Sequence, residues 1–279
     1  MPTLIPPHQL FQPNSKNMSP AIPPPAQDTQ QPTPTTLPII RKHKFETPRL
    51  RLQLHDLSHE GSSIFLSNIK GNEDLENQVQ NVLNLLYTPT STRPDTRSVT
   101  FIIHAFDGLA YTTGTELDDD HKEIHLNLDY LTKIRSDPRH ELLGVICHEL
   151  VHCFQWAAEG TCPGGFIEGV ADWVRLRAGL AARHWKQEAG GNWDGGYQHT
   201  GFFLEWLEQK FGDGTVRKLN EGLRKGKYNE EKLFEECCGG KKVGELWKDY
   251  GDGLKKKGGE DNKEDGPANP IPTHPAKAG

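Results

Sequence analysis

The sequence predicts an α+β fold in which a mixed or antiparallel sheet precedes a mainly helical half. Segments with strand-like alternation or β-branched composition lie mostly in the first half of the chain. Helical periodicity dominates after Pro138. The two kinds of segment do not alternate regularly, as they would in a parallel α/β fold, so an α+β arrangement is favoured.

The ordered part of the chain is predicted to be its middle. Hydrophobic residues make up only 34% of the 279 residues, and 12 of the 20 prolines fall within the first 48. Pro, Gln, Thr and Ser dominate the start of the chain, and Lys, Gly, Pro and Asp dominate its end. Such compositions cannot bury enough apolar surface to offset chain entropy. We therefore expect one domain over residues 43–256, between disordered tails at 1–42 and 257–279.

Three strands and one helix are predicted in the first half. Residues 50–54 alternate leucine with polar side chains, which indicates a half-buried strand. Residues 98–104 are rich in β-branched side chains and predict a buried strand, and residues 124–128 alternate as a strand with one polar face. Between the first two strands, apolar residues form one stripe of an amphipathic helix, namely Leu75, Val79, Val82, Leu83 and Leu86.

Helices are predicted throughout the second half. Their periodicity covers residues 140–158, 164–185, 199–211, 215–224, 229–237 and 242–254. The first of them carries an apolar stripe made of Leu143, Ile146, Leu150, Phe154 and Ala157. This stripe is turned away from His148 and His152, so we expect the two histidines to face something other than the core.

Charge and composition exclude several function classes. The net charge is -6 with acidic and basic residues intermixed, which gives no footprint for nucleic acid or an anionic membrane. No apolar run approaches a membrane span, and no signal-peptide segment opens the sequence, which predicts a cytoplasmic or non-classically secreted chain. The five cysteines form no CxxC pair, so buried free thiols are expected.

The motif that carries chemistry is His148-Glu149-Leu150-Val151-His152, an HExxH sequence. On a helix, the i and i+4 spacing places both imidazoles on one face, where they can ligate one zinc ion. Glu149 follows the first ligand and is placed to act as general base for a zinc-activated water. The spacing therefore predicts a catalytic zinc site.

A catalytic zinc needs a third protein ligand. The metzincin pattern fails because Gln155 and Ala158 replace its glycine and histidine, and the aspzincin pattern fails because Pro163 follows Gly160-Thr161-Cys162. The gluzincin arrangement remains, in which a second helix supplies a carboxylate.

Two carboxylates on the second predicted helix, Glu168 and Asp172, are candidates. We assign Glu168 as the third ligand, largely on motif resemblance, and Asp172 as the carboxylate that orients a ligating histidine. If the first helix continues to Ala158, however, Asp172 reaches the level of the histidines more easily. The non-functional alternative is that Glu168 and Asp172 are surface carboxylates whose charge is neutralised by Arg175.

The segments HELVHCFQW, PGGFIEGVADWVRLRAG and GYQHTGFFLEWL resemble the plant basic secretory protein family, a peptidase family of plants and bacteria. The resemblance is specific over residues 98–252 and extends back to residue 48. It implies a zincin-like fold of gluzincin type, one zinc ion and peptide-bond hydrolysis. The chain departs from the family in being acidic and in lacking a signal peptide, which puts secretion in doubt.

The same resemblance implies a group that stabilises the oxyanion, and a strand that binds substrate. Tyr197 and His199 follow a glycine-rich segment, and we assign Tyr197. The strand at 124–128 resembles the edge strand on which an extended peptide substrate adds, although a generic edge strand is the alternative.

We therefore expect a zinc-dependent metallopeptidase acting on peptide or protein substrates. The alternative is a catalytically inactive zinc-binding defence or interaction module. The intact Glu149 favours the enzyme, because a structural metal site needs no general base. Histidines without ligand spacing are expected to be ordinary surface or core residues, namely His43, His55, His59, His104, His121, His125 and His184.

Overall fold

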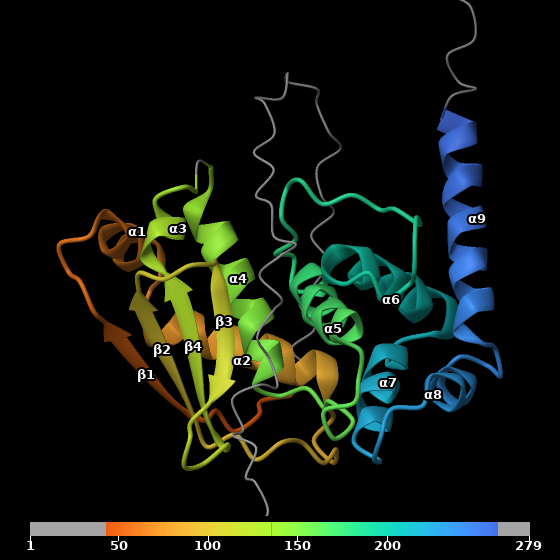
Figure 1. Ribbon diagram of the computed structural model, residues 1–279, viewed down its shortest axis with the longest axis horizontal. Helices are drawn as coiled ribbons and strands as arrows, with labels where there is room; N and C mark the ends of the chain where they lie inside the picture. The colour runs from red at the N-terminus through yellow and green to blue at the C-terminus, as the bar shows by residue number, and fades with distance from the viewer. Residues whose placement is uncertain (1–42, 135, 262–279) are drawn as a thin grey trace, which may run out of the picture.

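The computed structural model describes residues 43–134 and 136–261 (Figure 1). The predicted tail at 1–42 and residues 262–279 of the second predicted tail lie outside the described residues.

The described residues contain one four-stranded mixed sheet. Its strands are β1 (Arg49–Leu54), β2 (Ser98–His104), β3 (Ala110–Gly114) and β4 (His121–Asn127), in the spatial order β1-β2-β4-β3. β1, β2 and β4 are parallel, and β3 pairs antiparallel with β4. The expectation that the strand at 124–128 lies at the sheet edge is wrong, because β4 is enclosed between β2 and β3. The edge strand beside β4 is β3, and β1 forms the other edge. β3 has no apolar alternation in its sequence Ala-Tyr-Thr-Thr-Gly and was not predicted.

Nine helices make up most of the rest of the described chain. Those in the first half are α1 (Glu60–Asn68), α2 (Asn72–Leu86), α3 (Leu128–Leu131) and α4 (Pro138–His152). Those that follow are α5 (Gly164–Arg177), α6 (Tyr197–Phe211), α7 (Thr215–Leu223), α8 (Glu230–Cys237) and α9 (Val243–Asp261). The two short helices α1 and α3 were not predicted. The fold is therefore mixed, with the four strands and the helices α1, α2 and α3 preceding a helical half that begins with α4.

Helix α4 lies at the centre of the molecule, between the sheet and the helices of the second half (Figure 1). It contacts β3 on one side and α2 and α5 on others. The core-facing side chains of the sheet are fully buried, for example Phe101, Ile103 and Ile124, as are Ile146 and Leu150 of α4. Because α4 is fixed on several sides, the side chains at its end have a rigid support.

Helix α4 ends at His152 and not at Ala158 as predicted. After His152 the chain tightens into a turn, and Ala158 adopts a left-handed conformation with φ 51°. Two carbonyl groups just beyond the helix end accept hydrogen bonds from side chains that are distant in the sequence. The hydroxyl of Thr96 donates to the carbonyl of Cys153 at 2.6 Å, and that of Tyr87 donates to the carbonyl of Phe154. The helix end is therefore set by tertiary contacts.

Helix α5 also ends early, at Arg177 and not at 185. The amides of Gly179 and Leu180 donate to the carbonyls of Leu176 and Arg175, and Gly179 has φ +73°. This is a Schellman ending, in which a glycine takes the left-handed position that stops the helix.

All five cysteines are free, as expected, and Cys147, Cys153 and Cys238 are buried. Among the described residues, no helix has the length and the apolar character needed to cross a membrane.

Candidate metal centre

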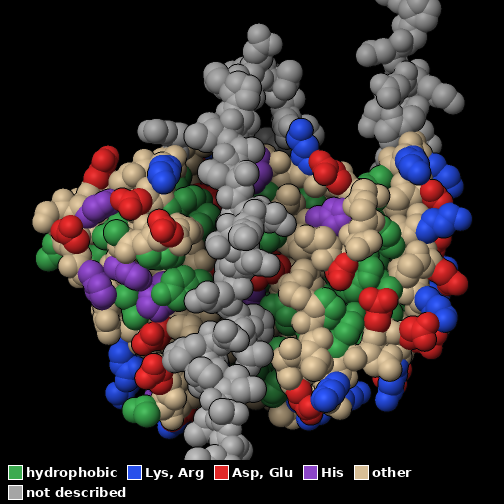
Figure 2. Space-filling view, viewed as in Figure 1, with side chains coloured by type: hydrophobic (Ala, Val, Ile, Leu, Met, Phe, Trp, Pro, Cys, Tyr) green, Lys and Arg blue, Asp and Glu red, His purple; other side chains and the backbone are tan. Residues whose placement is uncertain are grey.

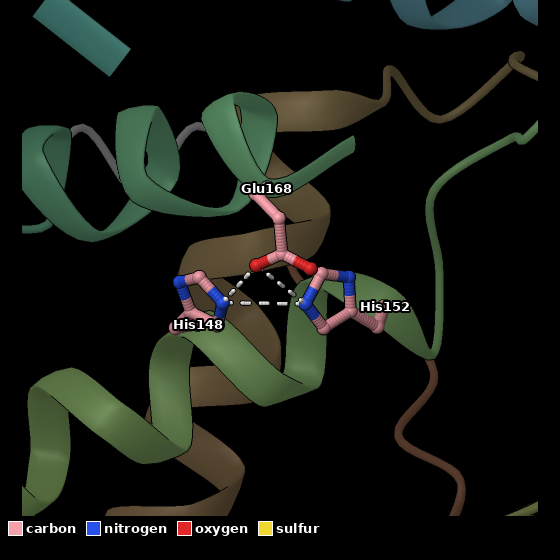
Figure 3. Close-up of side chains that lie close together, drawn as sticks. All are labelled: His148, His152 and Glu168. Atoms are coloured by element: carbon pink, nitrogen blue, oxygen red, sulfur yellow. Dashed lines mark hydrogen bonds and ion pairs between the residues drawn. The ribbon is translucent and has the colours of Figure 1, made fainter. Parts of the chain in front are cut away.

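The two histidines of the HExxH sequence and Glu168 come together at one point (Figure 3). His148 and His152 project from the last two turns of α4, and Glu168 projects toward them from the beginning of α5. Nε2 of His148 lies 3.3 Å from Nε2 of His152 and 3.0 Å from Oε2 of Glu168, which lies 3.7 Å from Nε2 of His152. Three potential ligand atoms thus converge, one from each side chain.

These distances fit one metal ion. Two ligands bound at ~2.0 to 2.1 Å in tetrahedral geometry lie ~3.3 to 3.4 Å apart, which matches the spacing of the two imidazole nitrogens. The early end of α4 explains how Glu168 reaches them, because the connection from Cys153 to Pro163 begins directly after His152. Asp172 was favoured only if α4 continued to Ala158, six residues beyond its observed end at His152.

Asp172 contacts the opposite side of His148. Its Oδ1 lies 2.7 Å from Nδ1 of His148, and its side chain is buried. With the proton on Nδ1 donated to this carboxylate, the lone pair of Nε2 points toward Glu168 and His152. The contact with Asp172 therefore orients the ring of His148 and draws a proton to its Nδ1.

Gln155 makes the matching contact with His152. Its amide nitrogen Nε2 lies 2.7 Å from Nδ1 of His152, and its buried Oε1 has no hydrogen-bond partner. Turning the amide over by 180° places Oε1 at this position, where it accepts the Nδ1 proton of His152 and gains the donor that it lacks. From the sequence, Gln155 was considered only as a mismatch to the metzincin pattern. Its contact with His152 was therefore not predicted.

Glu149 is held by the edge strand of the sheet. The hydroxyl of Thr112, on β3, donates to Oε2 of Glu149 at 2.7 Å and lies 3.0 Å from the Glu149 carbonyl oxygen. Glu149 is buried, with 6% exposure. Thr112 was missed because the polar sequence of β3 has no recognisable strand pattern.

Of the two residues considered as oxyanion donors, the structure brings Tyr197 to the cluster and not His199. The ring of Tyr197 is stacked near that of His148, with centroids 6.1 Å apart and planes at 13°. His199 instead hydrogen-bonds the carbonyl of Asn192 and packs on Trp247. Tyr197 begins α6 with φ 47°, a left-handed conformation that is uncommon for a tyrosine.

A family model described as "Peptidase of plants and bacteria" matches residues 47–250 of the chain. The chain belongs to this family. Searches of curated proteins and of solved structures returned no match.

Two glycines of α5 let this member of the peptidase family bring Tyr197 close to the histidines. A side chain at Gly165 would clash with the carbonyl of Asp194, and one at Gly169 would clash with the methyl group of Thr200. The segment that carries Tyr197 therefore lies directly on α5, beside Glu168.

Arg175 does not form an ion pair with Glu168 or Asp172. The non-functional alternative required such a pair. Arg175 is buried and turned to the other side, where it binds Glu141 at 3.1 Å and the carbonyl of Leu180 at 2.9 Å. Glu168 and Asp172 therefore have the two histidines as their neighbours.

The electrostatics of the His148, His152 and Glu168 cluster favour a positive charge. Burial acts to lower the pKa of His148, but the charge of Asp172 and hydrogen bonds with Asp172 and Glu168 raise it to about 10. Burial, and then the charge on His148, lower the pKa of His152. Burial acts to raise the pKa of Glu168, but the two histidines lower it overall. The carboxylates thus create a place for a cation, whether a proton or a metal ion.

Proposed function

We propose that this member of the family is a zinc-dependent metallopeptidase with a zincin-like fold of gluzincin type. His148, His152 and Glu168 are assigned as the ligands of one zinc ion, and Asp172 and Gln155 as the residues that orient the two imidazoles. The observation that carries the proposal is the convergence of three ligand atoms within 4.8 Å of one another. Two imidazoles and a carboxylate form a ligand set used by catalytic zinc.

Zinc in this position would act as a Lewis acid and lower the pKa of a water molecule. Glu149 is the general base. It accepts a proton from the attacking water and delivers it to the nitrogen of the leaving amine. The hydrogen bond from Thr112 holds the Glu149 carboxylate in one orientation, so the base does not have to be ordered during the reaction.

Tyr197 is assigned as the donor to the oxyanion of the tetrahedral intermediate. Burial and the charges of Glu168 and Glu149 raise the pKa of Tyr197 to about 12. The phenol therefore keeps its proton at neutral pH and can donate a hydrogen bond. Its side chain is 47% exposed, which allows contact with a substrate.

An extended peptide substrate would pair with the free side of β3. This strand is hydrogen-bonded to β4 on one side only, and its Thr112 touches the general base. Main-chain pairing along such an edge gives affinity that is largely independent of substrate sequence. The peptidase domain expected over residues 43–256 contains every residue to which a role is assigned here.

Hydrolysis of a mixed peptide library, with and without a chelator, tests the proposed function. The purified protein should cleave peptides, lose this activity with the chelator and regain it when zinc is added back. Glu149→Gln is the matched control, because it should bind zinc and cleave nothing. Zinc binding without cleavage by the unsubstituted protein would favour the inactive zinc-binding module.

A further inference from the structure

Histidine side chains gather at the surface where β1, β2 and β4 end (Figure 2). They belong to a row of four rings that crosses the whole sheet: Tyr111 on β3, His125 on β4, His104 on β2, and His55 directly after β1. The register places them on one face, since His125 lies opposite Ile102, and His104 is two residues beyond Ile102. This face is opposite to the one on which Thr112 meets Glu149.

The two central histidines are arranged as a pair of ligands would be. Nε2 of His104 lies 2.9 Å from Nδ1 of His125. Two nitrogens bound to one tetrahedral zinc at ~2.0 to 2.1 Å lie ~3.3 to 3.4 Å apart. The two rings, now at hydrogen-bond distance, must therefore move apart by ~0.4 to 0.5 Å to admit an ion.

The orientation of His125 is fixed from two sides. Its Nε2 lies 3.4 Å from Oε2 of Glu123, so the proton is drawn to Nε2 and Nδ1 presents its lone pair to His104. The ring of Tyr111 stacks on it at 4.3 Å with an interplanar angle of 7°. Phe106 packs against both Tyr111 and His104. A carboxylate behind a ligating imidazole is a common partner in metal sites.

Burial, and then the charge of His55, lower the pKa of His104. Burial, and then the charge of His104, lower the pKa of His125.

A third imidazole is adjacent. The amide of His55 donates to the carbonyl of Ile103, which extends the β1–β2 pairing by one residue and sets His55 beside His104. The two rings are 5.4 Å apart between centroids, and His55 is exposed. The nitrogens of the three rings do not all lie within 4.8 Å of one another, so the ring of His55 has to turn before it can complete the site.

We propose that His104 and His125, with His55 as third ligand, form a second site for a divalent transition metal that prefers imidazole, such as zinc. This site is separate from the His148 cluster and does not depend on the proposed function. It has only neutral ligands, whereas the His148 cluster includes a carboxylate, so it is the weaker of the two. It loads when metal is added and empties in a low-metal buffer.

Zinc titration of the full-length chain by equilibrium dialysis tests the proposal. After purification in low-metal buffer, the unsubstituted chain should retain the zinc of the His148 cluster. On titration it should bind one further zinc at the proposed second site. A chain with His104→Asn and His125→Gln should lose only this added zinc. A chain with His148→Ala and His152→Ala should lose the retained zinc and still bind the added one. Glu123→Gln should weaken the added zinc by ~10 to 100-fold.

His121→Gln is the control, because His121 lies on the same face of β4 and is bound to Ser98 instead. It should bind both zinc ions. NMR of the imidazole protons makes the test independent of substitutions, since added zinc should shift the signals of His104 and His125 and leave that of His121 in place. Absence of an added equivalent, or an added equivalent that survives in the His104→Asn, His125→Gln chain, would overturn the proposal and leave the pair as a hydrogen bond between two rings.

Discussion

The hydroxyl of Thr112 donates a 2.7 Å hydrogen bond to the carboxylate of Glu149, and so joins the edge strand of the sheet to the HExxH helix. In the proposed mechanism, one strand thereby serves two purposes. Its free side is available to an extended substrate, and its inward side chain orients the base that acts on that substrate.

Replacing Thr112 by valine should lower kcat and leave KM and zinc content nearly unchanged. Valine keeps the shape of the side chain and removes one hydrogen bond to a charged group, worth ~1.5 to 3 kcal/mol, or about 10 to 100-fold in rate. Thr112→Ser is the matched control and should restore most of the rate. Steady-state kinetics together with elemental analysis make the comparison. A Thr112→Val enzyme of normal activity would remove Thr112 from the mechanism.

Replacing Glu149 by glutamine should separate the base from the metal ligands. The variant should retain zinc and the fold, and it should lose hydrolysis by ~10² to 10⁴-fold, because the amide cannot take up a proton. Zinc content and circular dichroism are measured alongside the rate. Loss of zinc in this variant would mean that Glu149 belongs among the ligands.

The two carboxylates of α5 should respond differently to substitution. Glu168→Ala removes a ligand and should yield protein nearly free of zinc, since only two histidines remain. Asp172→Asn removes the acceptor for His148 and should reduce zinc affinity or activity by only ~10 to 100-fold. Dissociation constants from competition with a chromogenic chelator give the ranking. The reverse ranking would make Asp172 the third ligand.

Shortening the chain to residues 43–261 should leave zinc content and peptidase rate unchanged. Every residue with a proposed catalytic role lies between Thr112 and Tyr197, the proposed second metal site begins at His55, and the described helices end at Asp261. A rate that rises several-fold on truncation would instead indicate that a removed segment inhibits the enzyme. Loss of zinc or of solubility would show that the domain boundaries are misplaced.

Local patterns were enough to predict the elements that depend on local physics. Alternation located β1, apolar periodicity located α2, and the i, i+4 spacing placed His148 and His152 on one helical face. The remaining features depend on distant contacts. The end of α4 is set by Thr96 and Tyr87, far away in the chain.

The partners of the site residues were the hardest to predict. β3 has too few apolar residues to be recognised, so Thr112 could not be assigned a neighbour. Gln155 had no motif of its own, and its contact with His152 exists only because α4 ends there. The histidines of the sheet face are separated by 49 and 21 positions in the sequence, and only the strand order brings them together.

His148, His152 and Glu168 are the proposed ligands of one zinc ion. Elemental analysis of the purified chain in low-metal buffer, compared with a chain carrying His148→Ala and His152→Ala, shows whether they hold it. We expect about one zinc per unsubstituted chain and none in the double variant. Equal zinc in both chains, or no zinc in a folded unsubstituted chain that hydrolyses peptides, would contradict it.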